Sequence, residues 1–492
     1  MITLGPATPL DLARYRRVVQ QGERVELDPA ALDAVEERRA AMLAAVAGGA
    51  RAYGVTTGLG YMASRAIPAA DQAALQRSIL LGRSVAVGDP LPRPIVRGAM
   101  LLRLCAFLHG DAAVGAGLCR FLADRLNDGW TPYVPEGPDG AAGEVIPLSH
   151  LFQTFVGEGF VLEAGIRVPA AEALRARGVA PYEPALKEGI ALVNGAVVAP
   201  ALAVALVDRA RSLLEQATVS AALAAAAAGA SWRPYSPRVG RLKGDPGQMR
   251  VHEQLAALGD GAWLDLPQAP VSLRVVPQVH GAVHDLLDDA ERQLEREVAA
   301  VTDSPLYLPA DGAEPEGFYP SGNFHAQSVA FRLDAVAIGA AQVANLLEKR
   351  VHRLLDARFS GLPEQLAETP GSQTGASVLH KAVVGLCAEN RLLAAPASVV
   401  ASDTSAGQED VQAFALLAGS KLRRILDNLE LALAYELVAL RQASHLRDAP
   451  ASPALEAVAA RLAAVVEPLG ADRPLAPDVE AARELVRSGE LV

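Results

Sequence analysis

Hydrophobic residues recur at three- and four-residue spacing over long parts of the chain, the pattern of amphipathic α-helices. The spacing holds over about 283–303, 325–355 and 408–445, with single glycines at 339 and 419 as the interruptions in the last two stretches. Helices well beyond 25 residues are typical of a helical bundle. We therefore expect a long central bundle built from these stretches.

A shorter helix is predicted near the N-terminus, over 29–47. Asp28 suits the N-cap position, Pro29 suits the first helical position, and Gly48–Gly49 supplies the stop. Apolar residues of this stretch fall on one face, with Glu36 to Arg39 on the polar side.

Composition favours the same fold class. Hydrophobic residues make up 51% of the chain but aromatic residues only 4%, so the apolar content is mostly Ala, Leu and Val. Ala and Leu are strong helix formers. We expect a mainly α protein with a smaller N-terminal loop-rich α+β part, divided into domains at 1–185, 186–446 and 447–492 (the last a helical tail).

The charge balance argues against nucleic-acid and membrane-surface partners. The formal net charge is −11, and no run of Lys and Arg occurs anywhere. The N-terminus has no basic segment followed by an apolar core, so no signal peptide is expected. The nearly apolar stretch 190–207 contains Asn194, Gly195 and Pro200, and we interpret it as a buried helical segment rather than a membrane span.

Metal and phosphate sites are not indicated. The three cysteines are far apart and lack a CxxC spacing, which fits a reducing cytoplasm. No GxxxxGK[ST], GxGxxG or HExxH motif is present. His280 and His284 are spaced by four residues on a predicted helix, but no third ligand lies nearby in sequence, so we expect no metal.

Eight short segments rich in Gly, Ser, Asn and other polar residues carry more information. They lie at 53–60, 140–150, 187–195, 272–274, 277–279, 321–325, 395–398 and 408–410. In this order and spacing the chain resembles the aromatic amino acid ammonia-lyases, the family of histidine, phenylalanine and tyrosine ammonia-lyases and related aminomutases. The resemblance implies an ammonia-lyase/fumarase-like fold and a cytoplasmic homotetramer whose active sites combine loops of three subunits near converging helix N-termini.

The family's electrophile, a methylidene-imidazolone, forms from an internal Ala-Ser-Gly triplet when the serine loses its hydroxyl as water. The matching residues here are Ala141, Ala142 and Gly143, followed by Glu144 in place of the family's Asp. A methyl group cannot be eliminated. From this triplet we expect that no methylidene-imidazolone forms and that the protein uses no cofactor.

Other positions depart from the family as well. Val271 stands where the family has a Tyr that takes part in the chemistry, and Cys105 stands where it has the Asn of an Arg-x-Asn motif. These departures favour natural divergence over a single engineered Ser-to-Ala change.

Several family site residues are retained. Tyr53 matches the catalytic Tyr, a proposed general base, and Glu409 matches a carboxylate near the substrate. Phe324 matches the ring packed beside the cofactor. The substrate's carboxylate and amino group are held in the family by residues that match Asn194, Gln268 and Arg274.

The pair that selects the substrate side chain in this family aligns with Gly82 and Arg83. Gly82 opens space, whereas Arg83 adds a permanent positive charge. Either Arg83 faces the pocket and prefers an acidic ligand such as a dicarboxylate, or it is a surface residue at a helix end.

Three functions are compatible with these residues. The chain is expected to be a lyase that performs β-elimination on a small carboxylate-bearing substrate without the cofactor. The alternatives are a non-catalytic paralogue that binds a small carboxylate or a partner, and a histidine- or tyrosine-type ammonia-lyase inactivated by the Ser-to-Ala substitution.

Overall fold

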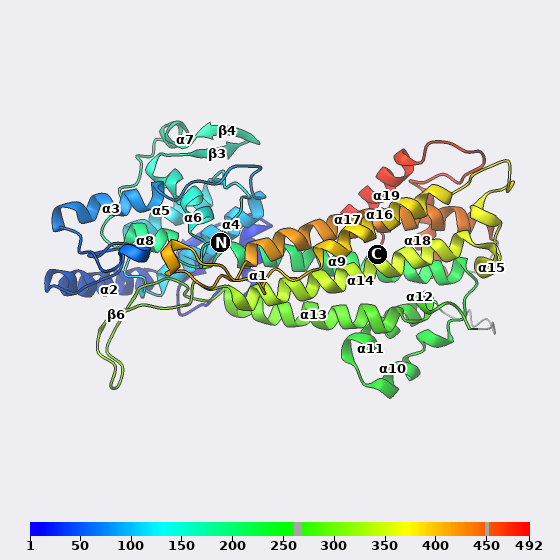
Figure 1. Cartoon of the computed structure of the whole chain (residues 1–492), viewed down its shortest axis with the longest axis horizontal. Coiled ribbons are helices and arrows are strands. Elements are labelled where there is room, and N and C mark those ends of the chain that lie inside the picture. The colour runs from blue at the N-terminus through cyan, green and yellow to red at the C-terminus, as the bar shows by residue number, and fades with distance from the viewer. Residues whose placement is uncertain (260–267, 448–451) are drawn as a thin grey trace. The chain divides into compact units, whose positions relative to one another are not determined.

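The computed structural model describes residues 1–259, 268–447 and 452–492, and these residues are mainly helical (Figure 1). They form two compact units. Unit 1 comprises Met1–Ala205, Glu291–Phe331 and Ala397–Gly419, and unit 2 comprises Leu206–Ala290, Arg332–Pro396 and Ser420–Val492. The predicted mainly α fold class is confirmed, whereas the domain boundaries at 185 and 446 stay a prediction.

Unit 1 combines short helices with three small two-stranded sheets. The strands pair as β1 (Ile2–Leu4) with β2 (Val25–Leu27), parallel, and as β3 (Phe160–Glu163) with β4 (Ile166–Pro169) and β5 (Leu306–Leu308) with β6 (Gly317–Tyr319), both antiparallel. The helices are α1 (Leu12–Val19), α2 (Pro29–Ala47), η1 (Gly60–Met62), α3 (Ala69–Leu81), α4 (Arg93–Leu108), α5 (Ala116–Asn127), α6 (Val145–Phe152), η2 (Gln153–Val156), α7 (Ala170–Ala176), α8 (Glu188–Val193) and η5 (Ser405–Gly407).

Helix α2 forms as its sequence predicts. The Asp28 carboxylate accepts a hydrogen bond from the Ala30 N–H, Pro29 occupies the first turn, and Gly48 caps the C-terminal end. Buried Leu32, Val35 and Met42 lie on its apolar side. The predicted bounds of this helix are confirmed.

Unit 2 contains the shorter helices η3 (Arg233–Tyr235), α10 (Pro237–Lys243), α11 (Pro246–Leu258), α12 (Val271–Arg274), α15 (Ala357–Ser360), η4 (Glu364–Leu366), α16 (Ser377–Leu393), α18 (Pro453–Ala463) and α19 (Ala476–Ser488). Four long helices have residues in both units: α9 (Val198–Ala227), α13 (Val276–Glu297), α14 (Gln327–Leu355) and α17 (Ala415–Leu446). They supply the expected long helical bundle.

Within unit 2 the long helices are joined by a buried polar network. The Arg350 guanidinium of α14 donates to both carboxylate oxygens of Glu436 on α17, at 2.7 and 2.9 Å. Ser220 of α9 donates to the same carboxylate at 2.6 Å. Arg350 and Glu436 are both fully buried, so each charge depends on the other for compensation.

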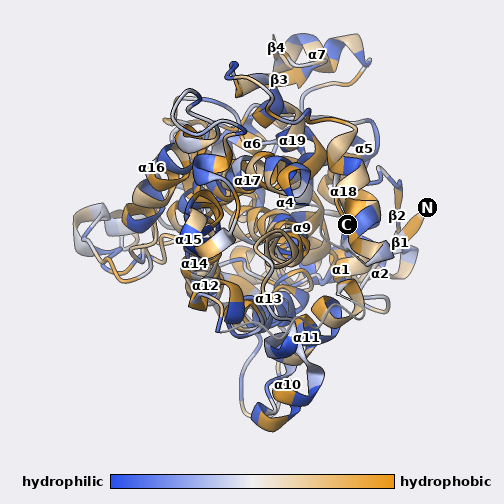
Figure 2. Cartoon of the chain, turned by 90° about the vertical axis from the view of Figure 1, so that its right-hand side faces the viewer, coloured by the Kyte–Doolittle hydropathy of each residue, from blue (hydrophilic) through white to orange (hydrophobic). Residues whose placement is uncertain are grey.

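Helix α9, seen end-on in Figure 2, belongs to the more apolar of the two segments that are long and apolar enough to cross a membrane. The segment Glu188–Ala227, which contains α8 and α9, is apolar and long enough to cross a membrane. However, 89% of its most apolar 18 residues are buried inside the protein. Helix α14 passes the same length and composition test with 67% buried. Burial of this kind is typical of core helices, as expected for 190–207.

Two predicted helix starts are wrong. The helix expected from 408 begins at Ala415, because Glu409 pairs with Thr404 and the backbone at Phe414 has a φ of 49°. The helix expected from 283 begins at Val276 and ends at Glu297. The helix expected over 325–355 is confirmed within two residues, and it continues through Gly339.

His280 and His284 pair with protein groups in unit 2. The His280 ring nitrogen Nδ1 lies 2.9 Å from the Thr218 hydroxyl, and that of His284 lies 3.3 Å from the Arg250 guanidinium. Burial lowers the pKa of both rings, and that of His284 falls to about 4.

Candidate functional site

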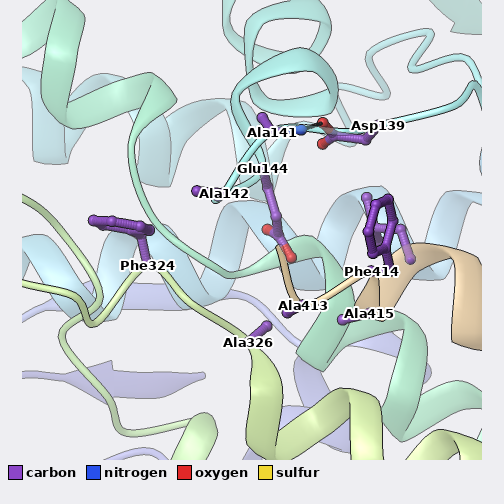
Figure 3. Close-up of a pocket in the computed structure, with 11 residues that line it drawn as sticks. Asp139, Ala141, Ala142, Glu144, Phe324, Ala326, Ala413, Phe414 and Ala415 are labelled. Carbon is purple, nitrogen blue, oxygen red and sulfur yellow. Dashed lines mark hydrogen bonds between the residues drawn. The ribbon is translucent and has the colours of Figure 1, made fainter. Parts of the chain in front are cut away.

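The Ala141-Ala142-Gly143 triplet lies in the loop that leads into α6, and carboxylates hold its backbone in place. The Ala141 N–H donates to Asp139 Oδ1 at 3.0 Å, and the Ala142 N–H donates to Glu409 Oε2 at 2.8 Å. Asp139 and the triplet line the pocket drawn in Figure 3. Two acidic side chains from distant parts of the sequence therefore bind consecutive N–H groups of the triplet.

Glu144 joins the start of α6 to the start of α9. Its carboxylate accepts hydrogen bonds from the N–H groups of Val197, Val198 and Ala199, at 2.7, 2.6 and 2.7 Å. These are N–H groups that a helix start otherwise leaves without a partner. Burial raises the pKa of Glu144, and the three N–H donors oppose that effect. The N-termini of two helices thus meet directly beside the triplet.

Buried charge lies beneath this junction. Arg103 of α4 is fully buried and donates from Nη1 to the Asn194 carbonyl at 2.9 Å. Lys187 and Asp303 form a fully buried ion pair at 2.6 Å. Gly195 has a φ of +142°, and a Cβ added there would lie 2.6 Å from Arg103 Nη2. Glycine is therefore required where the backbone passes the guanidinium.

The pocket beside the triplet has about 310 Å³ of empty space, counting the part open to solvent. Phe324 forms one side of it, since a Cβ added to Gly143 would lie 3.4 Å from the Phe324 Cβ. Ala326 and Phe414 also line the pocket (Figure 3).

Tyr53 is linked to the triplet through Glu409. The Tyr53 hydroxyl accepts a hydrogen bond from the Gly60 N–H at 2.8 Å, and Gly60 packs against Ser405. Ser405 in turn donates to Glu409 Oε1 at 2.6 Å, while the other oxygen of Glu409 holds Ala142. Glu409 and the triplet are therefore joined by hydrogen bonds, and the Tyr53–Gly60 pair adjoins them through the packing of Gly60 against Ser405 in unit 1.

The selectivity pair lies at the end of α3. Gly82 caps that helix and is exposed, whereas Arg83 is partly buried and donates to the Ile79 carbonyl at 3.1 Å. Burial lowers the pKa of Arg83, and its electrostatic interactions with Tyr53 and Glu409 oppose the shift. Arg83 therefore interacts electrostatically with both expected catalytic residues.

The remaining predicted residues are distributed over both units. Asn194 ends α8 in unit 1, and its side-chain amide donates to the Ser304 carbonyl at 2.6 Å. Gln268 and Arg274 belong to unit 2, where Gln268 is exposed and Arg274 Nε donates to the Ala269 carbonyl at 2.8 Å. Val271, which replaces the family's Tyr, is 58% exposed at the start of α12.

Asp139 and Phe414 are pocket residues that the sequence did not indicate. Burial raises the pKa of Asp139 to about 7, and the Glu144 and Glu409 carboxylates act in the same direction against the Ala141 N–H. The position of Asp139 two residues before the triplet is visible in the sequence, but its burial is not. Phe414 falls in a stretch that we predicted to be helical.

Comparison with known proteins places the chain in one family. The aromatic amino acid lyase family model matches residues 10–464. The histidine ammonia-lyase of Aromatoleum aromaticum is 38% identical over 98% of this chain and 92% of its own length. Among solved structures, a tyrosine aminomutase from Streptomyces globisporus matches with a TM-score of 0.92 and 30% identity, covering 100% of this chain and 97% of that one. A histidine ammonia-lyase from Trypanosoma cruzi matches with a TM-score of 0.90 and 29% identity, covering 100% and 94%.

These relatives correct the expected function. A chain so similar along almost its whole length to a histidine ammonia-lyase contradicts both a cofactor-independent lyase and a non-catalytic paralogue. The expectation of no cofactor is contradicted by the same relatives, because their family uses methylidene-imidazolone. That expectation rested on the triplet alone.

The residues of the triplet do not fit that group. Ala142 presents a methyl group where the formation of methylidene-imidazolone requires a β-hydroxyl that leaves as water, although the backbone cradle of Asp139, Glu409 and Glu144 is in place. Position 142 is thus where this chain departs from the triplet that forms the group in its family. This departure, like those at Cys105 and Val271, leaves the family assignment intact: the fold, the eight ordered segments and the match over 10–464 place this chain in the aromatic amino acid lyase family.

Proposed function

We propose that the protein is an ammonia-lyase that acts on a histidine-like aromatic amino acid. In this reaction a base removes a proton from Cβ, the electron pair of that C–H bond forms the Cα=Cβ double bond, and the protonated amino group leaves as ammonia with the electron pair of its C–N bond. The products are ammonia and an α,β-unsaturated carboxylate. The observation that carries the proposal is that Glu409 binds both Ser405 and the triplet, beside the Gly60 that holds Tyr53, in a chain 38% identical to a histidine ammonia-lyase.

Tyr53 is the proposed base. Its oxygen is fixed by the Gly60 N–H, and once the phenol has given up its own proton this oxygen can accept the proton from Cβ. Arg83 interacts electrostatically with Tyr53, and its positive charge attracts negative charge at the phenol oxygen. Glu409 positions the triplet through Ala142 and is the proposed partner of the substrate's amino group.

Asn194, Gln268 and Arg274 are proposed to hold the substrate carboxylate and amino group, and Phe324 to pack against its ring. An arginine guanidinium matches a carboxylate with two parallel hydrogen bonds. The roles of Gln268 and Arg274 rest on the family resemblance. We accordingly propose a homotetramer in the cytoplasm, as the family resemblance implies.

The test is an assay of ammonia release from L-histidine, L-tyrosine and L-phenylalanine by the purified protein and by Ala142→Ser. Absorbance of the conjugated product gives a second readout. Release from histidine, by either protein, supports the proposal. If neither protein releases ammonia and neither binds histidine in calorimetry, the proposal is wrong.

Tyr53→Phe and Tyr61→Phe form a matched pair of variants for the base. Both remove one hydroxyl from the same loop region, but Tyr61 is 64% exposed. A fall of about 100-fold or more in Tyr53→Phe alone is expected for loss of a general base. Equal activity in the two variants contradicts the role of Tyr53.

A further inference from the structure

A cluster of two histidines and one glutamate lies in unit 2, separate from the triplet. Glu348 and His352 are four residues apart on α14, so both side chains lie on one face of that helix. His380 comes from α16. One ligand atom of each residue lies within 4.8 Å of the other two.

The three side chains already contact one another. His380 Nε2 lies 2.6 Å from Glu348 Oε1. The rings of His352 and His380 are stacked, with centroids 4.7 Å apart and planes 19° apart. Glu348 is 4% exposed at its side chain and His380 22%, so the cluster lies at the edge of the core rather than free in solvent.

We propose that Glu348, His352 and His380 form a binding site for a divalent transition-metal ion. Two imidazole nitrogens and one carboxylate oxygen are a ligand set that such ions use when further coordination positions stay open to water or a small molecule. The ion joins α14 to α16, two helices that also meet where Cys387 contacts the Ala344 carbonyl.

Binding needs only a small movement of side chains. Metal–ligand bonds of about 2.0–2.2 Å place ligand atoms roughly 3.3 Å apart in a tetrahedral site. A metal lies near the plane of each imidazole that binds it, so one of the two stacked rings must turn about its side-chain bonds. Among the described residues, His380 is hydrogen-bonded to Glu348, whereas the partly exposed His352 has no such bond to a residue of the cluster. His352 is therefore the ring that turns.

An open cavity gives access to the cluster. It has about 880 Å³ of empty space, counting the part open to solvent, and His352 and His380 line it. Two acidic side chains and two basic side chains also line it: Asp356, Glu364, Arg358 and Lys381. Lys349, whose Nζ lies 2.7 Å from Glu348 Oε2, is 54% exposed and can move into solvent when a cation binds.

Zinc titration of the full-length protein by calorimetry, after treatment with a chelator, tests the site. We expect one Zn²⁺ per chain, and at least about tenfold weaker binding in His352→Ala and in His380→Ala, because each loses a direct ligand. Co²⁺ gives a second readout, since its visible absorption depends on the nitrogen ligands and is expected to disappear in the double variant.

His445→Ala is the matched control. His445 also lies near a glutamate, 3.6 Å from Glu368, but no third ligand group adjoins that pair among the described residues. The control is expected to keep the binding of the unmodified protein. Glu348→Gln, which preserves the shape of the side chain, checks the carboxylate if an alanine variant fails to fold. Absence of stoichiometric binding, or equal binding in all variants, overturns the proposal.

Discussion

Replacing Glu144 by alanine removes the acceptor for three backbone N–H groups at the start of α9. Glu144 is only 4% exposed, so water does not readily take its place. A hydrogen bond to a charged group contributes about 1.5–3 kcal/mol. Three such bonds share one carboxylate and are not additive, and we therefore expect the local opening free energy of this helix start to fall by about 3–5 kcal/mol.

Hydrogen exchange measured by mass spectrometry on the peptide that contains Val197, Val198 and Ala199 reports this opening directly. Since about 1.4 kcal/mol corresponds to a factor of ten, exchange is expected to accelerate by about 100- to 4000-fold. Glu144→Gln keeps one oxygen acceptor and replaces the other by an N–H donor. Its effect is expected to be smaller, at about 1–3 kcal/mol for the lost bond.

Glu183→Gln provides the control, because Glu183 is an exposed glutamate of the same unit. In this variant, hydrogen exchange at 197–199 is expected to match that of the unmodified protein. Unchanged exchange in Glu144→Ala would refute the proposed anchoring of the triplet loop to α9. Equal acceleration in Glu183→Gln would show a general loss of stability instead.

Three further predictions concern the same junction. Burial raises the pKa of Asp139 in the folded protein from 3.8 to about 7, so the contribution of Asp139 to the free energy of unfolding is fully present at low pH and is lost as the pH rises from about 4 through 7. Over that pH range the melting temperature is expected to fall less in Asp139→Asn than in the unmodified protein. Ala142→Ser is expected to lose the mass of two water molecules, visible by intact-protein mass spectrometry. A measured mass equal to that calculated from the variant's sequence contradicts the prediction that Asp139 and Glu409 hold the triplet backbone ready for cyclisation. Gly195→Ala is expected to lower the melting temperature markedly, because its Cβ would lie 2.6 Å from Arg103 Nη2 at a φ of +142°, and a melt equal to that of Gly117→Ala, where the added Cβ meets nothing, contradicts that packing.

Local sequence signals predicted elements whose hydrogen bonds are made nearby. The bounds of α2 follow from Asp28, Pro29 and Gly48, since each acts within the first or last turn of the helix. The α14 prediction succeeds for a related reason, because a long three- and four-residue repeat needs no information from elsewhere. Family resemblance added Tyr53, Glu409 and Phe324, which the structure brings together around the triplet in unit 1.

Long-range contacts decided what those signals could not. Helix α17 starts at Ala415 rather than near 408, because Glu409 is held by Thr404, Ser405 and the Ala142 N–H instead of continuing a helix. The relatives, and not the triplet, corrected the predicted function, since one side chain cannot outweigh similarity along the whole chain.

By itself the sequence determined the helical class, the caps of α2 and the identity of the residues at the triplet, including Ala142. Only the tertiary structure decided that Asp139 is partly buried near Glu409, that Glu144 caps α9, and that His380 meets α14. The physical reason is distance along the chain: helix periodicity and capping act over a few residues, whereas burial, charge pairing and ligand clusters depend on segments that only folding brings together.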